Sequence, residues 1–353
     1  PPAVTTAVCH VNLARGFRGG ERQTELLVRQ LAARGLSQTL VARRHQPLLE
    51  RLAGTTGLGL VPVGNSAPAA ALRCGRVAVI HAHEARGAHA AFLQHAFTRR
   101  PYLLTRRVSN LPGGDFFTRR VYRAASCVPC VAASVARGLE AWQPGVRTAV
   151  VHSAVSELVT DGRRIAALRE RHAGRFLVGH VGALDDKTKG QTHIIEAARS
   201  LRERCPDARV LLIGGGADEE RLKAAAGDLD NLEFTGFVDN VGDYLSVLDV
   251  FILPSNIDGI GGILLDAMQF GLPVVASRVG GLPEIVRDGD NGLLIDPASP
   301  DQLMAAIVRL HESPELRAAL GARGREFVSD FTPAKMAERY LRLYETACGR
   351  SLT

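Results

Sequence analysis

The sequence predicts an α/β protein built from two doubly wound domains, each with a parallel sheet. Short apolar runs typical of buried strands alternate along the chain with amphipathic stretches at helical spacing. The composition is globular, with 46% hydrophobic and 22% charged residues, and 353 residues are enough for two domains with separate cores. Loops at the carboxyl ends of such strands line ligand sites, so we expect a cleft between the domains.

The first half combines one clear helix with several apolar strands. A strand at 5–13 and a glycine-containing loop precede a helix at 21–35, which is apolar at 26, 27, 31 and 32 and ends at Gly35. Further apolar runs predict strands at 37–43, 58–63, 77–83, 101–107, 127–134 and 147–154.

The second half begins after a charged stretch at about 156–175, which shows no strand pattern and is interpreted as a connecting segment. Alternating patterns then predict strands and helices at 176–184, 193–205, 209–216, 219–227, 232–238, 241–248 and 250–255, with terminal helices at 299–313, 314–331 and 333–347. We therefore predict domains at 1–154 and 155–334. The helix at about 335–350 is expected to pack back on the first domain.

The charge is unevenly distributed between the halves. Residues 1–153 contain 20 arginines, no lysine and six acidic residues, a balance of +14, whereas the remainder carries −7. A basic half suits an anionic surface, such as lipid headgroups, a phosphorylated glycolipid or nucleic acid. An arginine-rich composition is the alternative explanation, but it would not spare the second half. Nucleic acid is disfavoured because no recognised module accompanies the charge.

Of six cysteines, only Cys127 and Cys130 are closely spaced. They lie in an apolar run without a second pair nearby, so zinc lacks its ligands. We interpret them as buried core cysteines in a reducing cytoplasm, with a redox role as the alternative. No run of about 18 apolar residues is present, so no transmembrane helix is predicted.

Residues 254–286 combine the features of an anion site and a sugar site. Asp258 and Asp266 lie eight residues apart, with a glycine-rich turn and a helix start between them. Amides at a helix start attract an anion, and glycines let it approach the backbone. Carboxylates accept hydrogen bonds from vicinal hydroxyl groups. The segment therefore predicts a site for a phosphate-bearing, polyhydroxylated ligand such as a nucleotide sugar.

Taken together, segments of nearly the whole chain resemble the retaining family 4 glycosyltransferases, which have the GT-B fold of two facing Rossmann-like domains. Each segment alone is a weak signal, but their combination in the family's order is specific. The resembling segments are 18–35, 79–83, 150–156, 181–190, 209–216, 234–255, 258–268, 271–286 and 288–295.

The resemblance assigns the two acids to the donor. The family pattern has two glutamates separated by seven residues, with Gly-aromatic-Gly after the first, whereas here both are aspartates and Ile260 replaces the aromatic residue. It implies that Asp258 contacts sugar hydroxyls near the anomeric centre and that Asp266 receives the ribose hydroxyls. A helix-capping role for Asp258 is the alternative, and the two roles are compatible.

Backbone positions complete the expected donor site. Amides from Ile260 to Ile263 would face the phosphates at the helix start. Positive φ alone would also explain the glycines. A dinucleotide motif at 214–216 is disfavoured because Glu219 replaces its third glycine. The glycines assigned to donor binding are Gly216, Gly259, Gly261 and Gly262.

By the same resemblance Lys189 pairs with the pyrophosphate and stabilises the departing nucleoside diphosphate. The arginine that usually accompanies it is replaced by Ala183, and Lys187 is the nearest substitute. The base is expected against the backbone at Phe237 and Val238.

In the first domain the resemblance places Gly19 and Gly20 in a loop that faces the donor diphosphate. It places His83, at the end of a strand, beside the sugar, although most histidines in such positions are structural. Arg106 and Arg107 stand near the place where relatives carry another histidine, and they are assigned to the acceptor side. Solvated surface arginines are the alternative.

The segment at 115–123 interleaves aromatic residues and arginines. As a helix it would suit shallow contact with an anionic membrane through Phe116, Phe117 and Tyr122, and packing on the domain core is the rival interpretation.

These observations predict a retaining, metal-independent hexosyltransferase with Asp258, His83 and Lys189 as its catalytic residues. No cofactor is expected, a UDP-sugar is the favoured donor, and no Asp-x-Asp motif stands at a strand end. The acceptor is expected to be a glycan or an anionic lipid-linked glycan in lipopolysaccharide, O-antigen or capsule biosynthesis, and the protein to be cytoplasmic, at the inner face of the membrane. The alternatives are a nucleotide-sugar epimerase and a catalytically weakened sugar-nucleotide-binding homologue.

Overall fold

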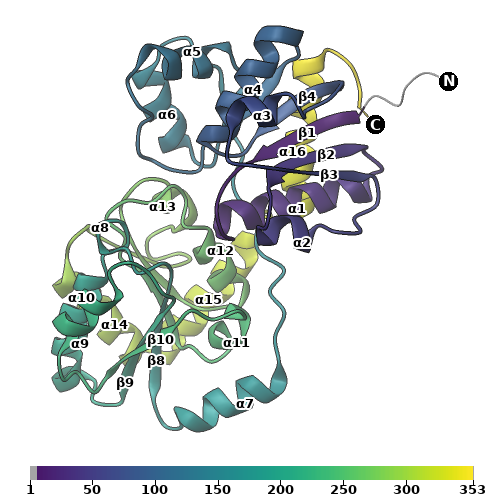
Figure 1. The fold of residues 1–353 in the computed structure, drawn as a ribbon. Coiled ribbons are helices and arrows are strands. Elements are labelled where there is room, and N and C mark those ends of the chain that lie inside the picture. The colour runs from purple at the N-terminus through teal and green to yellow at the C-terminus, as the bar shows by residue number, and fades with distance from the viewer. Residues whose placement is uncertain (1–5, 353) are drawn as a thin grey trace. The chain divides into compact units, whose positions relative to one another are not determined.

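The computed structural model describes residues 6–352 and divides into two compact units. Unit 1 comprises Pro1–Ser156 together with Phe331–Thr353, and unit 2 comprises Glu157–Asp330. Each unit is a parallel sheet with helices on its faces (Figure 1). The α/β fold class expected from the alternating pattern is confirmed.

Unit 1 has a five-stranded parallel sheet in the order β3-β2-β1-β4-β5 and a separate parallel pair, β6-β7. Its strands are β1 Thr6–Asn12, β2 Gln38–Arg43, β3 Leu58–Val63, β4 Val77–Ala82, β5 Tyr102–Leu104, β6 Val128–Cys130 and β7 Thr148–Val150. Its helices are α1 Gly19–Ala33, α2 Pro47–Arg51, α3 Ala67–Ala71, α4 Ala85–Thr98, α5 Phe116–Ala124, α6 Ala133–Trp142 and α16 Pro333–Cys348.

Unit 2 has a six-stranded sheet in the order β10-β9-β8-β11-β12-β13, with parallel pairing throughout. Its strands are β8 Phe176–Val181, β9 Ala208–Ile213, β10 Leu232–Gly236, β11 Val250–Leu253, β12 Val274–Ser277 and β13 Leu293–Ile295. Its helices are α7 Gly162–Arg171, α8 Asp186–Lys189, α9 Gln191–Arg204, α10 Glu219–Ala226, α11 Val241–Leu245, α12 Gly262–Gln269, α13 Leu282–Ile285, α14 Pro300–Glu312 and α15 Pro314–Val328.

Both sheets reverse their strand order at one place. In unit 1 the reversal lies between β1 and β4, and in unit 2 it lies between β8 and β11. At such a reversal the two following loops diverge to opposite faces and leave a crevice at the carboxyl edge of the sheet. The loops after β1, β4, β8 and β11 are therefore where each unit is expected to bind its ligand.

The C-terminal helix α16 packs on unit 1 through one apolar face. Its buried side chains share a hydrophobic cluster with Leu27 and Leu31 of α1 and with Val79 of β4. The α16 members of this cluster are Met336, Ala337, Tyr340 and Tyr344. The last helix thus completes the core of the first unit.

Two local expectations were wrong. The stretch at 156–175 contains helix α7, which Asp161 caps by accepting hydrogen bonds from the N–H groups of Arg163 and Arg164. No α7 residue is buried, and Ile165 and Leu168 are its only large apolar residues, so the charged residues around them hid the helix. The run at 127–134 is a strand only over β6, and it leads directly into α6.

The paired cysteines of this run remain thiols. Cys130 is buried and Cys127 is half-buried, and neither is in a disulfide. Burial raises the pKa of Cys127 to about 11 and that of Cys130 to about 12, which keeps both protonated at neutral pH. Within residues 6–352, no helix has both the length and the apolar character that a membrane span requires.

Gly321 of α15 is expected to tolerate no side chain. A Cβ there would lie 2.1 Å from the carbonyl oxygen of Gly271, so Gly321→Ala forces the two segments apart. We predict that unit 2 loses about 1–3 kcal/mol of unfolding free energy, although alanine is otherwise the better helix former. Urea unfolding measures the change. Gly162→Ala is the matched control, because its Cβ meets nothing within 4 Å, and an equal loss in both variants would contradict the packing argument.

Candidate functional site

The loops after β8 and β11 are joined backbone to backbone in unit 2. The carbonyl of Thr188 accepts hydrogen bonds from the N–H groups of Asn256 and Ile257, at 2.9 and 3.1 Å. Gly190 has φ of +68°, and a Cβ there would lie 2.4 Å from the carbonyl oxygen of Pro254. Only glycine combines this backbone conformation with so close an approach, so these contacts fix the two loops side by side.

The joined loops bring Lys189 and Asp258 into an ion pair. Lys189 Nζ lies 2.7 Å from Asp258 Oδ2, and the lysine and aspartate side chains are 26% and 10% exposed. Asp258 Oδ2 also accepts from Ser255 Oγ at 3.2 Å, while Oδ1 accepts from the N–H of Gly261 at 3.0 Å. The structure therefore brings together two of the three residues predicted to be catalytic. The contact with the N–H of Gly261 also fixes the turn that precedes α12, which begins at Gly262.

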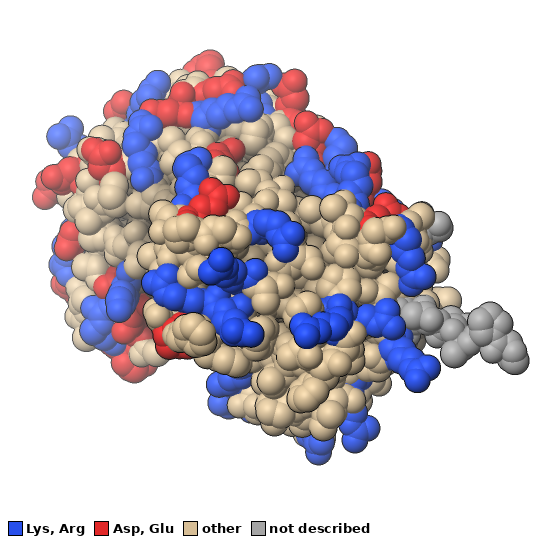
Figure 2. Space-filling view, turned by 90° about the horizontal axis from the view of Figure 1, so that it is seen from above, with Lys and Arg blue, Asp and Glu red and all other residues tan. Residues whose placement is uncertain are grey.

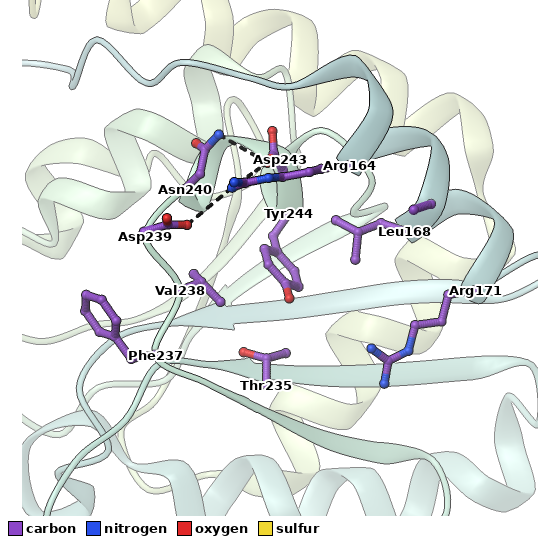
Figure 3. Close-up of a pocket in the computed structure, with 11 residues that line it drawn as sticks. Arg164, Leu168, Arg171, Thr235, Phe237, Val238, Asp239, Asn240, Asp243 and Tyr244 are labelled. Carbon is purple, nitrogen blue, oxygen red and sulfur yellow. Dashed lines mark hydrogen bonds and ion pairs between the residues drawn. The ribbon is translucent and has the colours of Figure 1, made fainter.

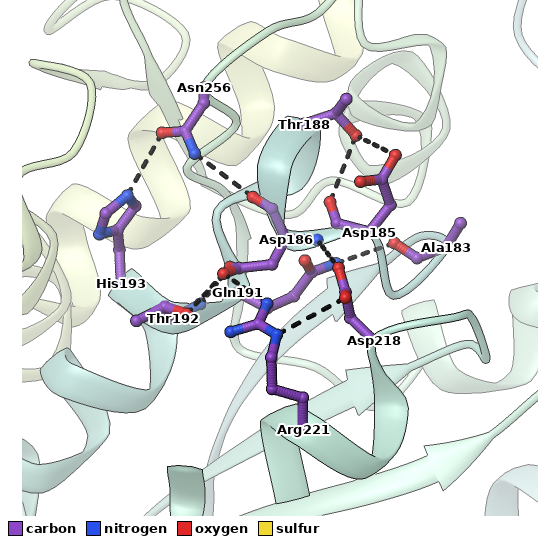
Figure 4. A network of polar contacts seen from close by, with 10 residues as sticks. All are labelled: Ala183, Asp185, Asp186, Thr188, Gln191, Thr192, His193, Asp218, Arg221 and Asn256. Carbon is purple, nitrogen blue, oxygen red and sulfur yellow. Dashed lines mark hydrogen bonds and ion pairs between the residues drawn. The ribbon is translucent and has the colours of Figure 1, made fainter.

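Asp186 anchors the short helix that carries Lys189 (Figure 4). Its carboxylate accepts from the N–H and hydroxyl of Thr192 at 2.7 and 2.6 Å and from Arg221 at 2.9 Å. Partial burial opposes ionisation, but these hydrogen bonds prevail and lower the pKa of Asp186. Its N–H donates to Asp218, and its carbonyl accepts from Asn256. The lysine helix is thereby tied both to α10 and to the loop after β11.

The turn between the two predicted donor acids is tightly packed. Ile260 is 5% exposed, so its side chain belongs to the core. Gly261 has φ of +63°, and a Cβ there would lie 2.5 Å from Leu282. Its N–H is already bonded to Asp258, whereas Gly262, which opens α12, has open space around its Cβ position. Asp266 lies on α12 and is 6% exposed.

The remaining positions assigned to the donor are Gly216, Gly259 and Ile263, all of which lie in unit 2. A Cβ at Gly216 would lie 2.3 Å from the carbonyl oxygen of Leu184, so close packing against the loop after β8 explains this glycine. The carbonyl of Gly259 accepts from the N–H of Gly281, and Ile263 lies in the first turn of α12. Their assigned contacts with a donor stay predictions.

Phe237 and Val238 line a pocket of about 590 Å³ in unit 2 (Figure 3). Phe237 is 82% exposed and offers an aromatic face. Neither Lys189 nor Asp258 is among the lining residues, so this pocket is separate from the ion pair, and the expected contact with a base stays a prediction. The other lining residues are Arg164, Ala167, Leu168, Arg171, Thr235, Asp239, Asn240, Asp243 and Tyr244.

Three histidines meet at the carboxyl edge of the sheet in unit 1. The parallel register places His10 of β1 beside His81 of β4, and His83 follows β4. Their side chains are 0%, 0% and 5% exposed, and one nitrogen from each lies within 4.8 Å of the others. Burial lowers the pKa of His10 to about 4. Burial, with the neighbouring histidines and Arg107, lowers the pKa of His81 and His83 well below its usual value, so the cluster is neutral at pH 7.

Both nitrogens of His10 and His81 are engaged in hydrogen bonds. His10 contacts Gln38 Oε1 at 2.9 Å and His83 Nε2 at 3.0 Å. His81 contacts the hydroxyl groups of Tyr344 and Thr105, each at 2.6 Å. Predicted catalytic His83 is therefore bonded to His10, while His81, whose ring lies against that of His83, is the histidine that contacts the C-terminal helix.

The two adjacent arginines of this unit point to different places. The guanidinium of Arg107 donates to the carbonyl of His83 at 3.3 Å, and its Cδ lies 3.7 Å from the Cβ position of Gly20. Gly19, which opens α1, has open space around its Cβ position. Arg106 turns to the hydroxyl of Tyr122 instead, at 3.2 Å. Of this pair, only Arg107 lies with the histidine and the glycines.

Helix α5 carries the predicted membrane segment on unit 1. Phe116 is 79% exposed and Phe117 is 43% exposed, and the ring of Phe117 also packs edge-to-face on Phe92 of α4. Tyr122 is 5% exposed and contacts Trp142, so its expected place at the interface was wrong. Tyr122 follows Phe116 and Phe117 by about one and a half helical turns, so it lies on the inward-facing side of α5.

The residues that hold these site side chains in place by hydrogen bonds were not predicted from the sequence. His10 and Gln38 were counted only as strand residues, and Asp186 and Arg221 only as charged residues. Their signal lies in parallel register and in contacts between distant loops, which a single sequence does not display.

Comparison with known families and curated proteins places the chain among sugar transferases. Residues 175–313 match the family described as glycosyl transferases group 1. The lipopolysaccharide core biosynthesis glycosyltransferase LpsE of Rhizobium meliloti (strain 1021) is 27% identical over 336 residues, covering 92% of this chain and 95% of LpsE. A GDP-mannose-dependent alpha-(1-6)-phosphatidylinositol monomannoside mannosyltransferase of Mycolicibacterium smegmatis is 32% identical over 226 residues, 60% of this chain and 56% of that protein.

Solved structures agree on the fold. Anabaena Alr3699/HepE, in complex with UDP and glucose, has a TM-score of 0.84 at 18% identity, covering 97% of this chain and all of that one. Sucrose-phosphate synthase from Thermosynechococcus elongatus has a TM-score of 0.78 at 20% identity, with 96% and 98% covered. The chain is therefore a glycosyltransferase of the GT-B fold that carries a group 1 glycosyl transferase domain at residues 175–313.

Proposed function

We propose that this glycosyltransferase moves a hexosyl group from a nucleotide sugar to a glycan or glycolipid, with retention of the anomeric configuration and without a metal ion. The ion pair between Lys189 and Asp258 carries this proposal. It stands at the strand reversal of unit 2, where a phosphate and a sugar would need opposite charges side by side.

Donor binding would exchange partners within this pair. The diphosphate takes the positive charge of Lys189, and Asp258 is then available to accept hydrogen bonds from sugar hydroxyls. As the bond to the leaving phosphate breaks, negative charge grows on the diphosphate, and the lysine charge stabilises it most at that stage. A fixed cation at this place supplies charge that a metal ion supplies elsewhere. Asp258 is assigned electrostatic and positioning roles only.

The relatives support the classes of donor and acceptor. LpsE is named for lipopolysaccharide core biosynthesis, and the mycobacterial relative transfers mannose to a phosphatidylinositol mannoside. The Anabaena protein holds UDP and glucose. We assign a UDP-hexose as donor on this basis, with the base beside Phe237 and Val238, and a lipopolysaccharide-type acceptor to unit 1. The epimerase and the degenerate binding module are not favoured, because the relatives with a named activity are transferases.

Contact with the inner face of an anionic membrane is the second part of the proposal. Phe116, Arg120 and Arg123 recur at helical spacing on α5, and all three side chains are exposed. Leu111 and Val108, in the preceding segment, are 56% and 51% exposed. Lys and Arg side chains predominate over the central and lower part of the face in Figure 2. Aromatic rings beside arginines suit the interface between headgroups and acyl chains.

A panel of UDP-, GDP- and ADP-sugars, incubated with the protein in EDTA with and without membrane extract, tests the reaction. We expect transfer of radiolabelled sugar from a UDP-hexose to extractable lipid, and an α-linked product from an α-linked donor by NMR. Isomerised donor without transfer would support an epimerase, and binding without turnover would support a degenerate module. Activity that EDTA abolishes would contradict metal-independent transfer.

Loss of either charge of the pair is expected to disable transfer. We predict that Lys189→Met and Asp258→Asn each lower kcat/KM by about 10²- to 10³-fold, because each removes charge stabilisation of the transition state. The double variant should lose little more than the worse single one, since the residues act together. Lys223→Met is the matched control, because Lys223 pairs with Glu219 on the surface of α10. Near-normal rates in Lys189→Met, with unchanged melting, would reject the assignment.

Replacing both aromatic residues of α5 should weaken membrane binding. We predict that the Phe116→Ser, Phe117→Ser variant partitions about tenfold less onto vesicles containing anionic lipid, because two apolar rings no longer enter the interface. Vesicle co-sedimentation at low salt measures this. Phe237→Ser serves as control, since Phe237 is equally exposed but lies in unit 2. Equal losses in both variants, or wild-type protein that ignores the vesicles, would refute the membrane proposal.

A further inference from the structure

The buried contacts of unit 1 fix where the protons of its histidines lie. Gln38 Nε2 donates to the carbonyl of Val28 at 3.0 Å, and a carbonyl only accepts, so the other amide atom of Gln38 is its oxygen. That oxygen lies 2.9 Å from His10 Nε2, which must therefore carry a proton. Because His10 is neutral, its Nδ1 carries none.

The same reasoning extends to His83. His10 Nδ1 is an acceptor and lies 3.0 Å from His83 Nε2, so His83 Nε2 must donate. His83 is also neutral, and its Nδ1 is consequently a bare lone pair. The chain of contacts from Val28 through Gln38 and His10 leaves a single arrangement of protons. We call these three linked side chains, Gln38, His10 and His83, the histidine relay.

This lone pair has no partner among the described residues. His83 Nδ1 is buried and accepts no hydrogen bond within residues 6–352. His81 stacks 3.9 Å away, centroid to centroid, but both of its nitrogens are bound to hydroxyl groups. A buried acceptor without a donor costs about 1–3 kcal/mol, which a ligand hydroxyl would recover.

The surroundings favour a hydroxyl over a charged donor. The guanidinium of Arg107 donates to the carbonyl of the same His83, and its charge disfavours a cationic ligand there. A Cβ at Gly19, which opens α1, would meet nothing within 4 Å, whereas at Gly20 it would meet Arg107 Cδ at 3.7 Å, so only Gly19 leaves open space at this helix start. Sugars present hydroxyl donors without charge, so they match a neutral acceptor beside a fixed cation.

We propose that His83 Nδ1 accepts a hydrogen bond from a hydroxyl of the sugar acceptor, and that His10 and Gln38 are positioning residues that hold His83 in the accepting form. The inference rests on the proposed transfer to an acceptor bound by unit 1. His83 orients the hydroxyl. The relay keeps the His83 proton on Nε2, so that Nδ1 stays an acceptor. Removing the relay therefore affects transfer and leaves donor binding by unit 2 unchanged.

Two substitutions of His10 separate positioning from packing. His10→Phe keeps an aromatic ring but offers no acceptor to His83 Nε2, so His83 loses its fixed tautomer. His10→Asn places an amide oxygen near the position of Nδ1 and restores an acceptor. We expect His10→Phe to lower transfer to membrane extract about tenfold, and His10→Asn to remain within about threefold of wild type. Binding of the same nucleotide sugar by unit 2 should be unchanged in both.

Nitrogen-15 NMR of histidine-labelled wild-type protein tests the relay without any substitution. We expect His10 and His83 to be protonated at Nε2 and bare at Nδ1, and the His83 tautomer to become mixed in His10→Phe. A protonated His83 Nδ1 in the wild type, an inactive His10→Asn, or unchanged transfer in His10→Phe would each overturn the inference. Wild-type protein that neither binds nor turns over any nucleotide sugar would refute the proposed function instead, and the tautomers would still be measured.

Discussion

The ion pair between Lys189 and Asp258 is the contact on which the proposed donor site depends. It joins the loops that follow β8 and β11, the two strands at which the sheet of unit 2 reverses its order. The two charges are partly buried and 2.7 Å apart, so each stabilises the other only while both loops keep their positions. If either partner were removed, the other would be left as an unpaired, partly buried charge. Backbone bonds to Thr188 and the glycine at 190 provide that hold.

Unit 1 has a strand reversal of the same kind, but the histidine side chains there are neutral instead of charged. Where unit 2 places two charges, unit 1 places three buried neutral histidines at the carboxyl ends of β1 and β4. Full burial and the positive charge of Arg107 both disfavour imidazolium, so this site offers lone pairs and fixed donors instead of carboxylates. The charged pair of unit 2 suits its proposed role of balancing a diphosphate. The neutral histidines of unit 1 suit its proposed role of orienting an uncharged hydroxyl group.

Much of the fold was predictable, because buried parallel strands are continuous apolar runs and their helices have amphipathic patterns. The exception is α7, which buries no residue and whose few apolar residues lie among charged ones, so it was not predicted as a helix. Spacing and resemblance singled out Lys189 and Asp258 as candidate site residues, but they did not predict that the two side chains pair directly. Arg106 and Arg107 are equivalent in sequence, and only the structure separates them, since consecutive side chains leave an extended backbone on opposite sides.

The same geometry bears on the shorter acid at position 258. An aspartate carboxylate stays close to its own backbone, and here one oxygen caps the turn before α12 while the other meets the lysine. A glutamate would carry its carboxylate one methylene further from the backbone, so it would have to bend back to reach the N–H of Gly261. The close approach of Gly190 to the carbonyl of Pro254 holds the lysine helix beside the loop that carries the aspartate. The short acid and the tight junction of the loops therefore fit one another in this structure.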